Sequence, residues 1–299
     1  MKPILILANS DKNLLPFQKA SSDIKQRVVF ANYREICFGD GDKGRILIKK
    51  EREIFDVQKD FSLIFFRTVK HNMERVNLIV DYIDSQVLVV DRINKGGVYR
   101  ATKAFQYRRL LSNDLPVTPF IYGSLDLLYE RANLLGFPLV IKRSEGSQGR
   151  QVYLVKDKWS LRKFYQSYQK YEDRSGKYYL AQKFIDNDGD YRILVLGNQV
   201  LGVMKRERVD KNEFRNNVSL GGMIQKAVLP NSMLLMAIKA ASVCEIEVAG
   251  VDIILDKENG RPFILEVNRS PQFKGLMKAT GVNIPKAIID FLIKLAKND

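Results

Sequence analysis

Histidine and cysteine are nearly missing from this 299-residue sequence, which contains one histidine and two cysteines. With His71 alone, a multi-histidine metal site is excluded, as are most catalytic triads. Cys37 and Cys244 lie far apart in the sequence, and neither belongs to a metal-binding or redox motif. We therefore interpret both thiols as small buried hydrophobes and expect a cytoplasmic protein in a reducing compartment.

Long apolar runs and low-complexity tracts are also missing. No apolar stretch approaches the roughly 18 to 20 residues that a membrane helix requires, and no long Pro, Ser or Gln tract indicates disorder. The opening run MKPILILANSDKN lacks a basic segment, a longer apolar segment and a cleavage site. We therefore interpret this run as a first strand and expect no membrane partner.

Positive charge is abundant by contrast. The sequence has 49 Lys and Arg residues against 34 Asp and Glu residues, a formal net charge of +15. This charge indicates either a lysine-rich solvated surface or attraction to an anion such as a nucleotide, an acidic peptide or a nucleic acid. Charge alone does not choose between these interpretations.

Short apolar runs alternate with amphipathic segments along the chain. The runs predict strands at 3–8, 27–31, 62–66, 86–90, 137–143, 151–155, 178–185, 190–198, 199–206, 248–255 and 261–268. Helical spacing predicts helices at 70–84, 99–112, 125–136, 158–171 and 231–244, and a last helix after Pro285. Strands and helices in separate clusters indicate an α+β chain of small subdomains rather than one doubly wound sheet.

The strands at 248–255 and 261–268 carry three oxygen-bearing side chains. Glu266 and Asn268 share one strand face, and reflection of the hairpin about Asn259 places Asp252 opposite Glu266. This pairing requires a loop longer than a two-residue turn. Two adjacent carboxylates repel unless a cation lies between them, and with an amide oxygen they suit Mg²⁺. A solvent-facing polar edge is the alternative that this segment leaves open.

A second group of residues could bind phosphate. Lys142 ends an apolar strand and is followed by the glycine-containing turn SEGSQGR, whose backbone could fold over a polyphosphate. The GxxxxGK[ST] spacing of a P-loop is missing, and a plain hairpin turn fits equally well. Arg192, Arg206 and Arg215 lie on or beside the strands that lead to the hairpin. A convergent set would suit a transferring phosphoryl group, although isolated surface arginines are common in so basic a chain.

Taken in order, these segments resemble the RimK branch of the ATP-grasp superfamily. The matching runs are YLAQKFIDNDGDYRILVLGNQVLGVMKRE, FRNNVSLGG, VAGVDIIL and FILEVNRSPQFKGLMKATGVNI, preceded by FPLVIKRSEGSQGRQVYLV. The likeness is strongest over 137–289, weaker over 96–136, and limited over 1–90 to compatibility with the family's variable N-terminal domain.

The resemblance implies an ATP-grasp fold with a small N-terminal α/β domain, in three units. Residues 1–95 would form the N-terminal domain, and residues 96–180 the central subdomain with a flexible phosphate loop. Residues 181–299 would form the C-terminal subdomain with the metal site.

Carried over position by position, the resemblance implies three groups of functional residues. Those expected to contact ATP are Lys103, Lys142, Ser147, Gln148, Gln182, Lys183, Phe184, Ile185, Asp190 and Asn216. Those expected at the phosphate and acyl-phosphate end, as catalytic residues, are Arg192, Arg206, Arg215 and Asn217. Those expected to bind Mg²⁺, as two ions with Mn²⁺ as a substitute, are Asp252, Glu266 and Asn268.

Some of these positions carry a more specific expectation. The backbone of Lys183 and Phe184 would read the edge of adenine, and Asp190 would hold the ribose. The family usually has glutamate where Lys183 stands, so any contact from that carboxylate is lost. Arg269 replaces the small residue that commonly follows the asparagine, so substrate contacts there are expected to differ.

The implied reaction is phosphoryl transfer from ATP to a carboxylate, attack by an amine and release of phosphate. Metal and arginines spread the developing charge, so no histidine is required. Closure of the loop at 143–150 would exclude water and protect the acyl phosphate. The resemblance implies addition of glutamate or another amino acid to a carboxylate of a protein, a peptide or a small molecule. Glutamate is the favoured amino acid, and the charge of +15 favours an acidic peptide or protein tail as carboxylate acceptor. The resemblance also implies a homo-oligomer.

Two alternatives stay open. One is an ATP-grasp enzyme that cross-links ribosomally made peptides. The other is a basic RNA-binding or ribosome-binding protein with a vestigial ATP site. The second is disfavoured because all three expected metal ligands are present and no stacking pattern of aromatic and basic residues is evident. Nucleic acid is therefore not expected as a substrate.

Overall fold

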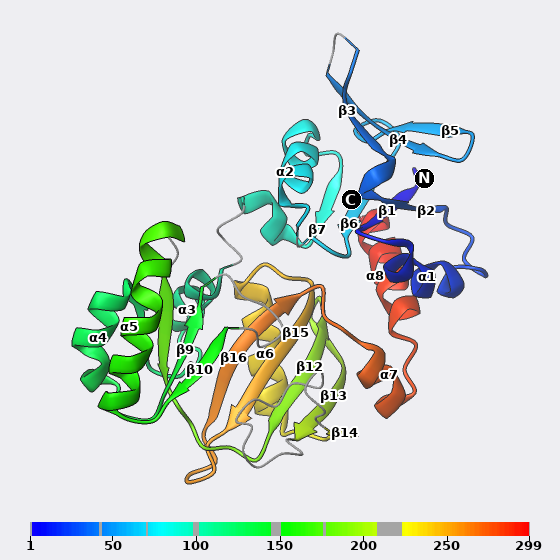
Figure 1. Cartoon of the computed structure of the whole chain (residues 1–299). Coiled ribbons are helices and arrows are strands. Elements are labelled where there is room, and N and C mark those ends of the chain that lie inside the picture. Colours follow the sequence, from blue (N-terminus) through cyan, green and yellow to red (C-terminus); the bar gives the residue numbers. More distant parts are fainter. Residues whose placement is uncertain are drawn as a thin grey trace.

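The computed structural model describes residues 2–41, 44–69, 71–97, 102–144, 151–175, 178–207 and 223–298. Its strands form four sheets, and helices pack on their faces (Figure 1). Among the described residues, no helix has the length and apolar character needed to cross a membrane.

The first sheet is parallel, with the strand order β2-β1-β6-β7. Its strands are β1 (Ile4–Ala8), β2 (Val28–Asn32), β6 (Leu63–Phe66) and β7 (Leu88–Val90). The adjoining helices are α1 (Asp11–Ala20) and α2 (Met73–Tyr82), with short 3₁₀ turns η1 (Tyr33–Glu35) and η2 (Arg92–Gly96). All four strands were predicted, because each is a short apolar run that is buried in the sheet.

A small antiparallel sheet beside this unit was not predicted. It consists of β3 (Ile36–Asp40), β4 (Arg45–Lys50) and β5 (Glu53–Asp56). The apolar runs of these strands are at most three residues long and are flanked by charged residues or glycine. Cys37 lies on β3 and is exposed, whereas Cys244 is buried. The prediction that both thiols are buried was therefore wrong for Cys37.

The central sheet is antiparallel and has the order β10-β9-β11-β8. Its strands are β8 (Phe120–Gly123), β9 (Leu139–Arg143), β10 (Val152–Val155) and β11 (Tyr179–Lys183). Helices α4 (Leu125–Arg131) and α5 (Lys158–Ser175), with the 3₁₀ turn η4 (Ala132–Leu134), accompany it. Leu128 of α4 and Phe164 of α5 share a buried cluster with Leu139 and Ile141 of β9, so both helices cover one face of the sheet.

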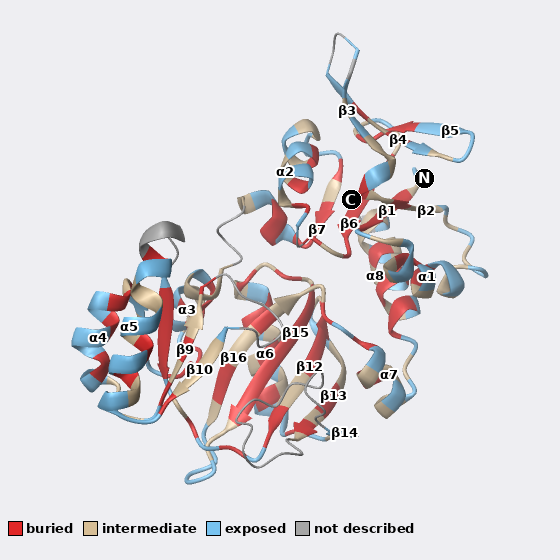
Figure 2. Cartoon of the chain, in the orientation of Figure 1, coloured by how far each residue is buried: buried red, intermediate tan, exposed pale blue. Residues whose placement is uncertain are grey.

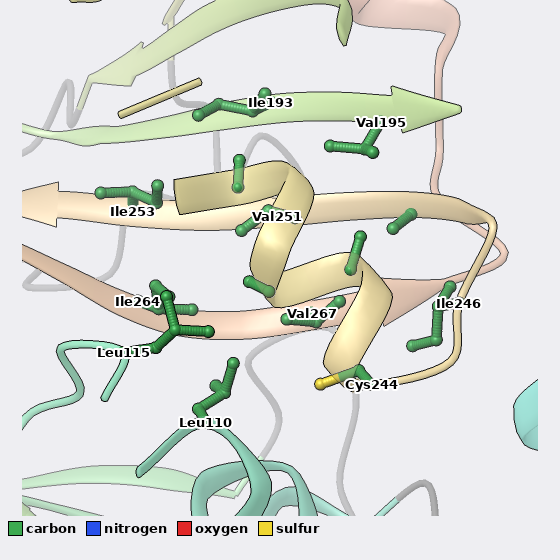
Figure 3. Close-up of a cluster of buried hydrophobic side chains, with 14 of the residues drawn as sticks. Leu110, Leu115, Ile193, Val195, Cys244, Ile246, Val251, Ile253, Ile264 and Val267 are labelled. Atoms are coloured by element: carbon green, nitrogen blue, oxygen red, sulfur yellow. The ribbon is translucent and has the colours of Figure 1, made fainter. Parts of the chain in front are cut away.

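The last sheet has five antiparallel strands in the order β14-β13-β12-β15-β16. They are β12 (Asp190–Leu196), β13 (Gln199–Glu207), β14 (Met223–Lys226), β15 (Val248–Leu255) and β16 (Pro262–Arg269). Helix α6 (Asn231–Val243) covers one face, over a core that includes Ile193, Val251, Ile253 and Val267 (Figure 3). In Figure 2, β15 is buried along almost its whole length, whereas β16 mixes buried and half-buried residues.

Three helices connect these units. Helix α3 (Lys103–Leu111) contacts β16 and α6 of the last sheet. Helices α7 (Lys274–Thr280) and α8 (Ile284–Asn298) follow β16, and α8 returns to pack against α1 and the first sheet (Figure 1). Ile288 and Leu292 of α8 share a buried cluster with Ile4 of β1. The same cluster includes Leu194 and Val248 of the last sheet, so α8 packs against both the first and the last sheet.

Candidate active site

The hairpin of β15 and β16 carries the expected pair of carboxylates. Asp252 is directly opposite Glu266, as predicted, and Gly250 is opposite Asn268. The loop spans residues 256–261, and the register shifts at a bulge where Ile253 pairs with Ile264. Leu265 is thereby left out of the pairing, and this extra residue brings Glu266 level with Asp252. The sequence argument considered only the loop length and missed the bulge.

A row of charges crosses three neighbouring strands on the face that α6 does not cover. Arg192 of β12 is level with Asp252 of β15, which is level with Glu266 of β16. Arg192 Nε and Nη2 donate to Asp252 Oδ1 and Oδ2 at 2.5 and 2.7 Å. Asn268 Nδ2 also donates to Asp252 Oδ2, at 3.2 Å. The arginine and the two carboxylates, expected separately, therefore form one continuous site.

Arg206 joins this row from β13. Its Nε and Nη2 donate to both carboxylate oxygens of Asp190 at 2.5 and 2.8 Å, and its Nη2 lies 3.1 Å from Asp252 Oδ2. Arg206 and Asp190 are both buried. If Asp190 binds the ribose as expected, the ribose hydroxyls must share its carboxylate oxygens with Arg206.

Burial and charge act in opposite directions on the two aspartates. Burial raises the pKa of Asp190 to about 6, although Arg206 opposes the rise. Burial also acts to raise the pKa of Asp252, but the charges of Arg192 and Arg206 outweigh it and hold the pKa below its ordinary value. Asp252, which has two arginine partners, is therefore the more firmly ionised carboxylate.

Helix α3 brings a lysine to the outer side of Glu266. Lys103 Nζ lies 3.5 Å from Glu266 Oε1. Two buried contacts with the outer strand hold the helix in place: Gln106 Nε2 donates to Val267 O at 2.7 Å and Gln106 Oε1 accepts from Val267 N at 3.2 Å. Tyr107 donates from its hydroxyl to Leu265 O at 3.0 Å. Sequence reasoning missed Gln106, although a polar residue on the buried side of a helix was the available signal.

The central sheet supplies a second lysine. Lys142 lies near the end of β9, where burial lowers its pKa to about 8 while the charge of Glu266 raises it. The positive charge of Lys103 also lowers the pKa of Lys142, and the charge of Asp252 raises it. The electrostatic environment of Lys142 therefore includes Lys103 and both carboxylates of the row.

The expected hinge is β11 and the residues that follow it. Gln182 is buried and donates to Thr118 Oγ1 at 2.7 Å. The backbone N–H groups of Lys183 and Phe184 donate to Pro119 O and Pro138 O at 2.9 and 3.0 Å. Those two N–H groups are therefore used within the protein, which leaves the carbonyls for an adenine edge. A hollow of about 340 Å³ lies beside this segment, lined by residues 183–186 and 256–258.

Five of the expected site residues lie outside the described part of the chain. They are Ser147, Gln148, Arg215, Asn216 and Asn217. The other twelve expected residues lie within the described ranges.

Asp252, Glu266 and Asn268 are the residues that could hold a divalent cation. Within the described ranges, no three His, Cys, Asp or Glu side chains form a cluster that could hold a metal. A cation would thus depend on Asp252, Glu266 and the amide of Asn268, with other oxygens from outside the protein. Hard oxygen donors of this number and kind fit Mg²⁺, which keeps few protein ligands. They fit no soft metal.

Comparison with known proteins agrees with the ATP-grasp resemblance of the sequence. Residues 115–292 match the family model described as a RimK-like ATP-grasp domain. A probable alpha-L-glutamate ligase of Trichodesmium erythraeum (strain IMS101) is 34% identical over 183 residues, which are 60% of this chain and 59% of the relative. The alignments cover less than two thirds of the length of the first curated relatives.

Two solved structures have a similar fold. The macrocyclase MdnC of Microcystis aeruginosa MRC, bound with precursor peptide MdnA, superposes with a TM-score of 0.72 at 12% identity, covering 98% of this chain and 99% of that one. A RimK domain protein ATP-grasp from Sphaerobacter thermophilus DSM 20745 gives 0.69 at 15% identity, with 97% and 99% covered. The predicted α+β, ATP-grasp fold class is confirmed.

Proposed function

We propose that this protein, which belongs to the RimK-like ATP-grasp family, is an ATP-dependent ligase that joins a carboxylate to an amine through an acyl phosphate. The observation that carries the proposal is the charge row of Arg192, Asp252 and Glu266 on three adjacent strands. Lys103, Lys142 and Arg206 surround this row. Such an array suits a triphosphate with its cation better than it suits a neutral ligand.

The nucleotide would lie between the central and last sheets. Lys183 pairs with Leu139 on β9, and Lys142 is three residues farther along the same strand. At about 3.3 Å per residue, roughly 10 Å separates the hinge from the lysine. That span suits a nucleotide with its base beside residues 183–185 and its phosphates at Lys142. The hollow beside the hinge supports the base position.

Mg²⁺, when bound to Asp252, Glu266 and Asn268, would neutralise phosphate charge and polarise the transferring phosphoryl group. Arg192 and Arg206 already hold Asp252 ionised, so the carboxylate needs no deprotonation before it binds a cation. Both guanidinium groups lie on the same face, where each could also donate to a phosphate oxygen. Lys103 would hold Glu266 and contact phosphate from the other side.

For the substrates, we propose glutamate as the amine and an acidic peptide or protein tail as the carboxylate acceptor. Curated relatives named as probable alpha-L-glutamate ligases support the amine. The net charge of +15 supports the acceptor, because a basic surface attracts an acidic chain. Because salt screens this attraction, added salt should weaken binding of the acidic acceptor more than binding of a neutral one.

Cross-linking of a ribosomally made peptide is the second candidate. The structural likeness to a macrocyclase bound with its precursor peptide favours it. An enzyme of this kind would release ADP with a precursor peptide alone, and the product mass would fall by one water for each bond formed. A glutamate ligase would instead require free glutamate, and the product mass would rise.

The deciding experiment measures ADP release across a panel of amino acids, acidic peptides and neutral peptides, with the mass of each product determined. We expect turnover to require both a carboxylate and an amine, and Mg²⁺ or Mn²⁺. Absence of ADP release with every pair, or release that continues unchanged in Glu266→Gln, would contradict the proposed function.

A further inference from the structure

The four parallel strands of the first sheet end in polar residues at one edge. Asn9 follows β1, Asn32 ends β2, Arg67 follows β6 and Asp91 follows β7. In the sheet, β2 lies on one side of β1 and β6 lies on the other. The connection from β1 to β2 and the later connection to β6 therefore run in opposite directions across the sheet. Ligands of open parallel sheets bind outside the carboxyl ends of the strands at such a change of direction. The edge shared by β1 and β6 is therefore a candidate ligand position.

Arg67 is buried at this edge, with 6% of its surface exposed. Its Nη2 donates to Pro271 O at 2.9 Å, and its guanidinium lies 4.8 Å from the ring centre of Phe273. Its Nε has no hydrogen-bond partner in the part of the chain that the structure describes. A buried guanidinium N–H without an acceptor is costly, so this atom indicates a ligand with an oxygen.

The charges around Arg67 are unbalanced. Asp91 is the buried carboxylate whose charge acts on Arg67, and the same carboxylate acts on Arg269. Asp91 Oδ1 also accepts from Val248 N at 2.8 Å, and burial raises the pKa of Asp91 to about 8. Two guanidinium groups thus face one buried carboxylate that is hard to ionise, and the neighbouring Glu247, whose charge also acts on Asp91, is paired with Arg92. Buried charges need partners, so the cluster favours a further anion.

Arg67 is also connected to the carboxylate row. Pro271, whose carbonyl it binds, follows Asn268 by three residues. A Cβ built on Gly250 would lie 2.9 Å from Pro271 Cβ and 3.1 Å from Arg192 Cδ. Pro271, in the segment held by Arg67, and Arg192, which binds Asp252, therefore both pack close to Gly250. A group bound at Arg67 would be next to the reacting centre but outside it.

We propose that Arg67 binds a carboxylate of a substrate, one that takes no part in the new bond, with its Nε donating to one oxygen. A guanidinium suits this task because its N–H groups match the two oxygens of a carboxylate. The carboxylate belongs either to the amine substrate, as in glutamate, or to the acidic acceptor. The inference rests on the proposed function, because it names the part of the ligase substrate that this residue holds.

The first test observes the Nε–H group itself. In ¹⁵N-labelled full-length protein, the Arg67 Nε–H resonance is assigned by its loss in Arg67→Lys. We expect this resonance to move with saturation on addition of L-glutamate or a tetraglutamate peptide, with Mg²⁺ and a non-hydrolysable ATP analogue present. Glutamine and isoglutamine, each lacking one carboxylate, identify the group that is bound. A resonance unmoved by both glutamate and the peptide overturns the proposal.

This test separates the inference from the proposed function. Movement of the resonance without any ligation product would support the anion site and count against the ligase. Ligation without movement would support the ligase and overturn the role of Arg67.

The second test is kinetic and uses a matched arginine. Arg67→Gln is expected to raise the KM of the carboxylate-bearing substrate about 10- to 100-fold, with the KM of ATP nearly unchanged. Arg109 is the control, since it also donates to a backbone carbonyl, Val243 O at 3.2 Å, but has its own carboxylate in Glu245 at 3.2 Å. Arg109→Gln is expected to leave both KM values near those of the unaltered protein.

A structural role predicts a different pattern. If Arg67 only clamps Pro271, both KM values rise together, and the preference for glutamate over its amides is unchanged in Arg67→Gln. That result overturns the proposal. Arg67→Lys keeps the charge and replaces Arg67→Gln if the glutamine variant does not fold. If Arg67→Lys keeps the full preference for glutamate over its amides, with the KM of the carboxylate-bearing substrate unchanged, the Nε contact is also contradicted.

Discussion

The two faces of the last sheet use the same strands for different purposes. On the face under α6, Ile193, Val251 and Ile253 pack into an apolar core (Figure 3). On the other face, Arg192 and Asp252, their neighbours in sequence, form a charged row. Because side chains alternate along a strand, adjacent residues serve stability and chemistry separately. Substitutions on the two faces should therefore be separable by measurement.

The largest expected effect is on the charged face. Glu266→Gln removes one of two carboxylates available to a cation, so we expect turnover to fall roughly 100-fold or more. Its melting temperature should change little, because Glu266 is partly exposed and its ion pair with Lys103, at 3.5 Å, is long. ADP release and thermal unfolding measure the two quantities. The exposed Glu130→Gln is the matched control and should leave both unchanged.

The opposite result is expected on the apolar face. Ile253→Ala removes a fully buried side chain beside Asp252, and the free energy of unfolding should fall by about 2 to 5 kcal/mol. Turnover per folded molecule should stay close to normal, because the charged row is untouched. Denaturant unfolding and ADP release test this. Leu134→Ala, at a residue that is 70% exposed, should cost about 0.5 kcal/mol or less.

Gly250→Ala tests how closely Pro271 and Arg192 pack around Gly250 at the site. The new methyl would lie 2.9 Å from Pro271 Cβ and 3.1 Å from Arg192 Cδ, so one of these must shift. We expect kcat to fall about 10- to 100-fold, since small displacements at a reacting centre are costly. Gly202→Ala is the comparison, because its nearest neighbours are side-chain methyl groups at 3.4 Å, which is ordinary van der Waals contact. Equal activity of the two variants would contradict the close packing.

The smallest expected effect is a dependence on pH. A lysine is charged below its pKa, and burial lowers the pKa of Lys142 to about 8. As pH rises through 8, Lys142 loses its charge and its attraction for phosphate, so the KM of ATP should increase about tenfold per pH unit at most. Lys142→Arg stays charged and should flatten the profile. A KM that is constant from pH 7 to 9.5 in the unaltered protein would contradict this.

Local patterns predicted much of the fold and part of the site. Apolar runs and alternation located the strands of the three main sheets except β8 and β14, and the face shared by Glu266 and Asn268. They did not locate α1, α7 or the small sheet of β3 to β5, where apolar residues are interrupted by charged ones or proline. The ATP and metal assignments came from the family resemblance, and the individual contacts stay predictions.

The sequence by itself determined which side chains share a face, because strand alternation depends only on neighbouring residues. It also determined that carboxylates, arginines and lysines would be available for an anion and a hard cation. Only the tertiary structure decided their partners: Arg192 and Arg206 on Asp252, Gln106 on β16, and Arg67 on Pro271, 204 residues away. Such pairings depend on how separate sheets pack, and no local periodicity specifies that packing.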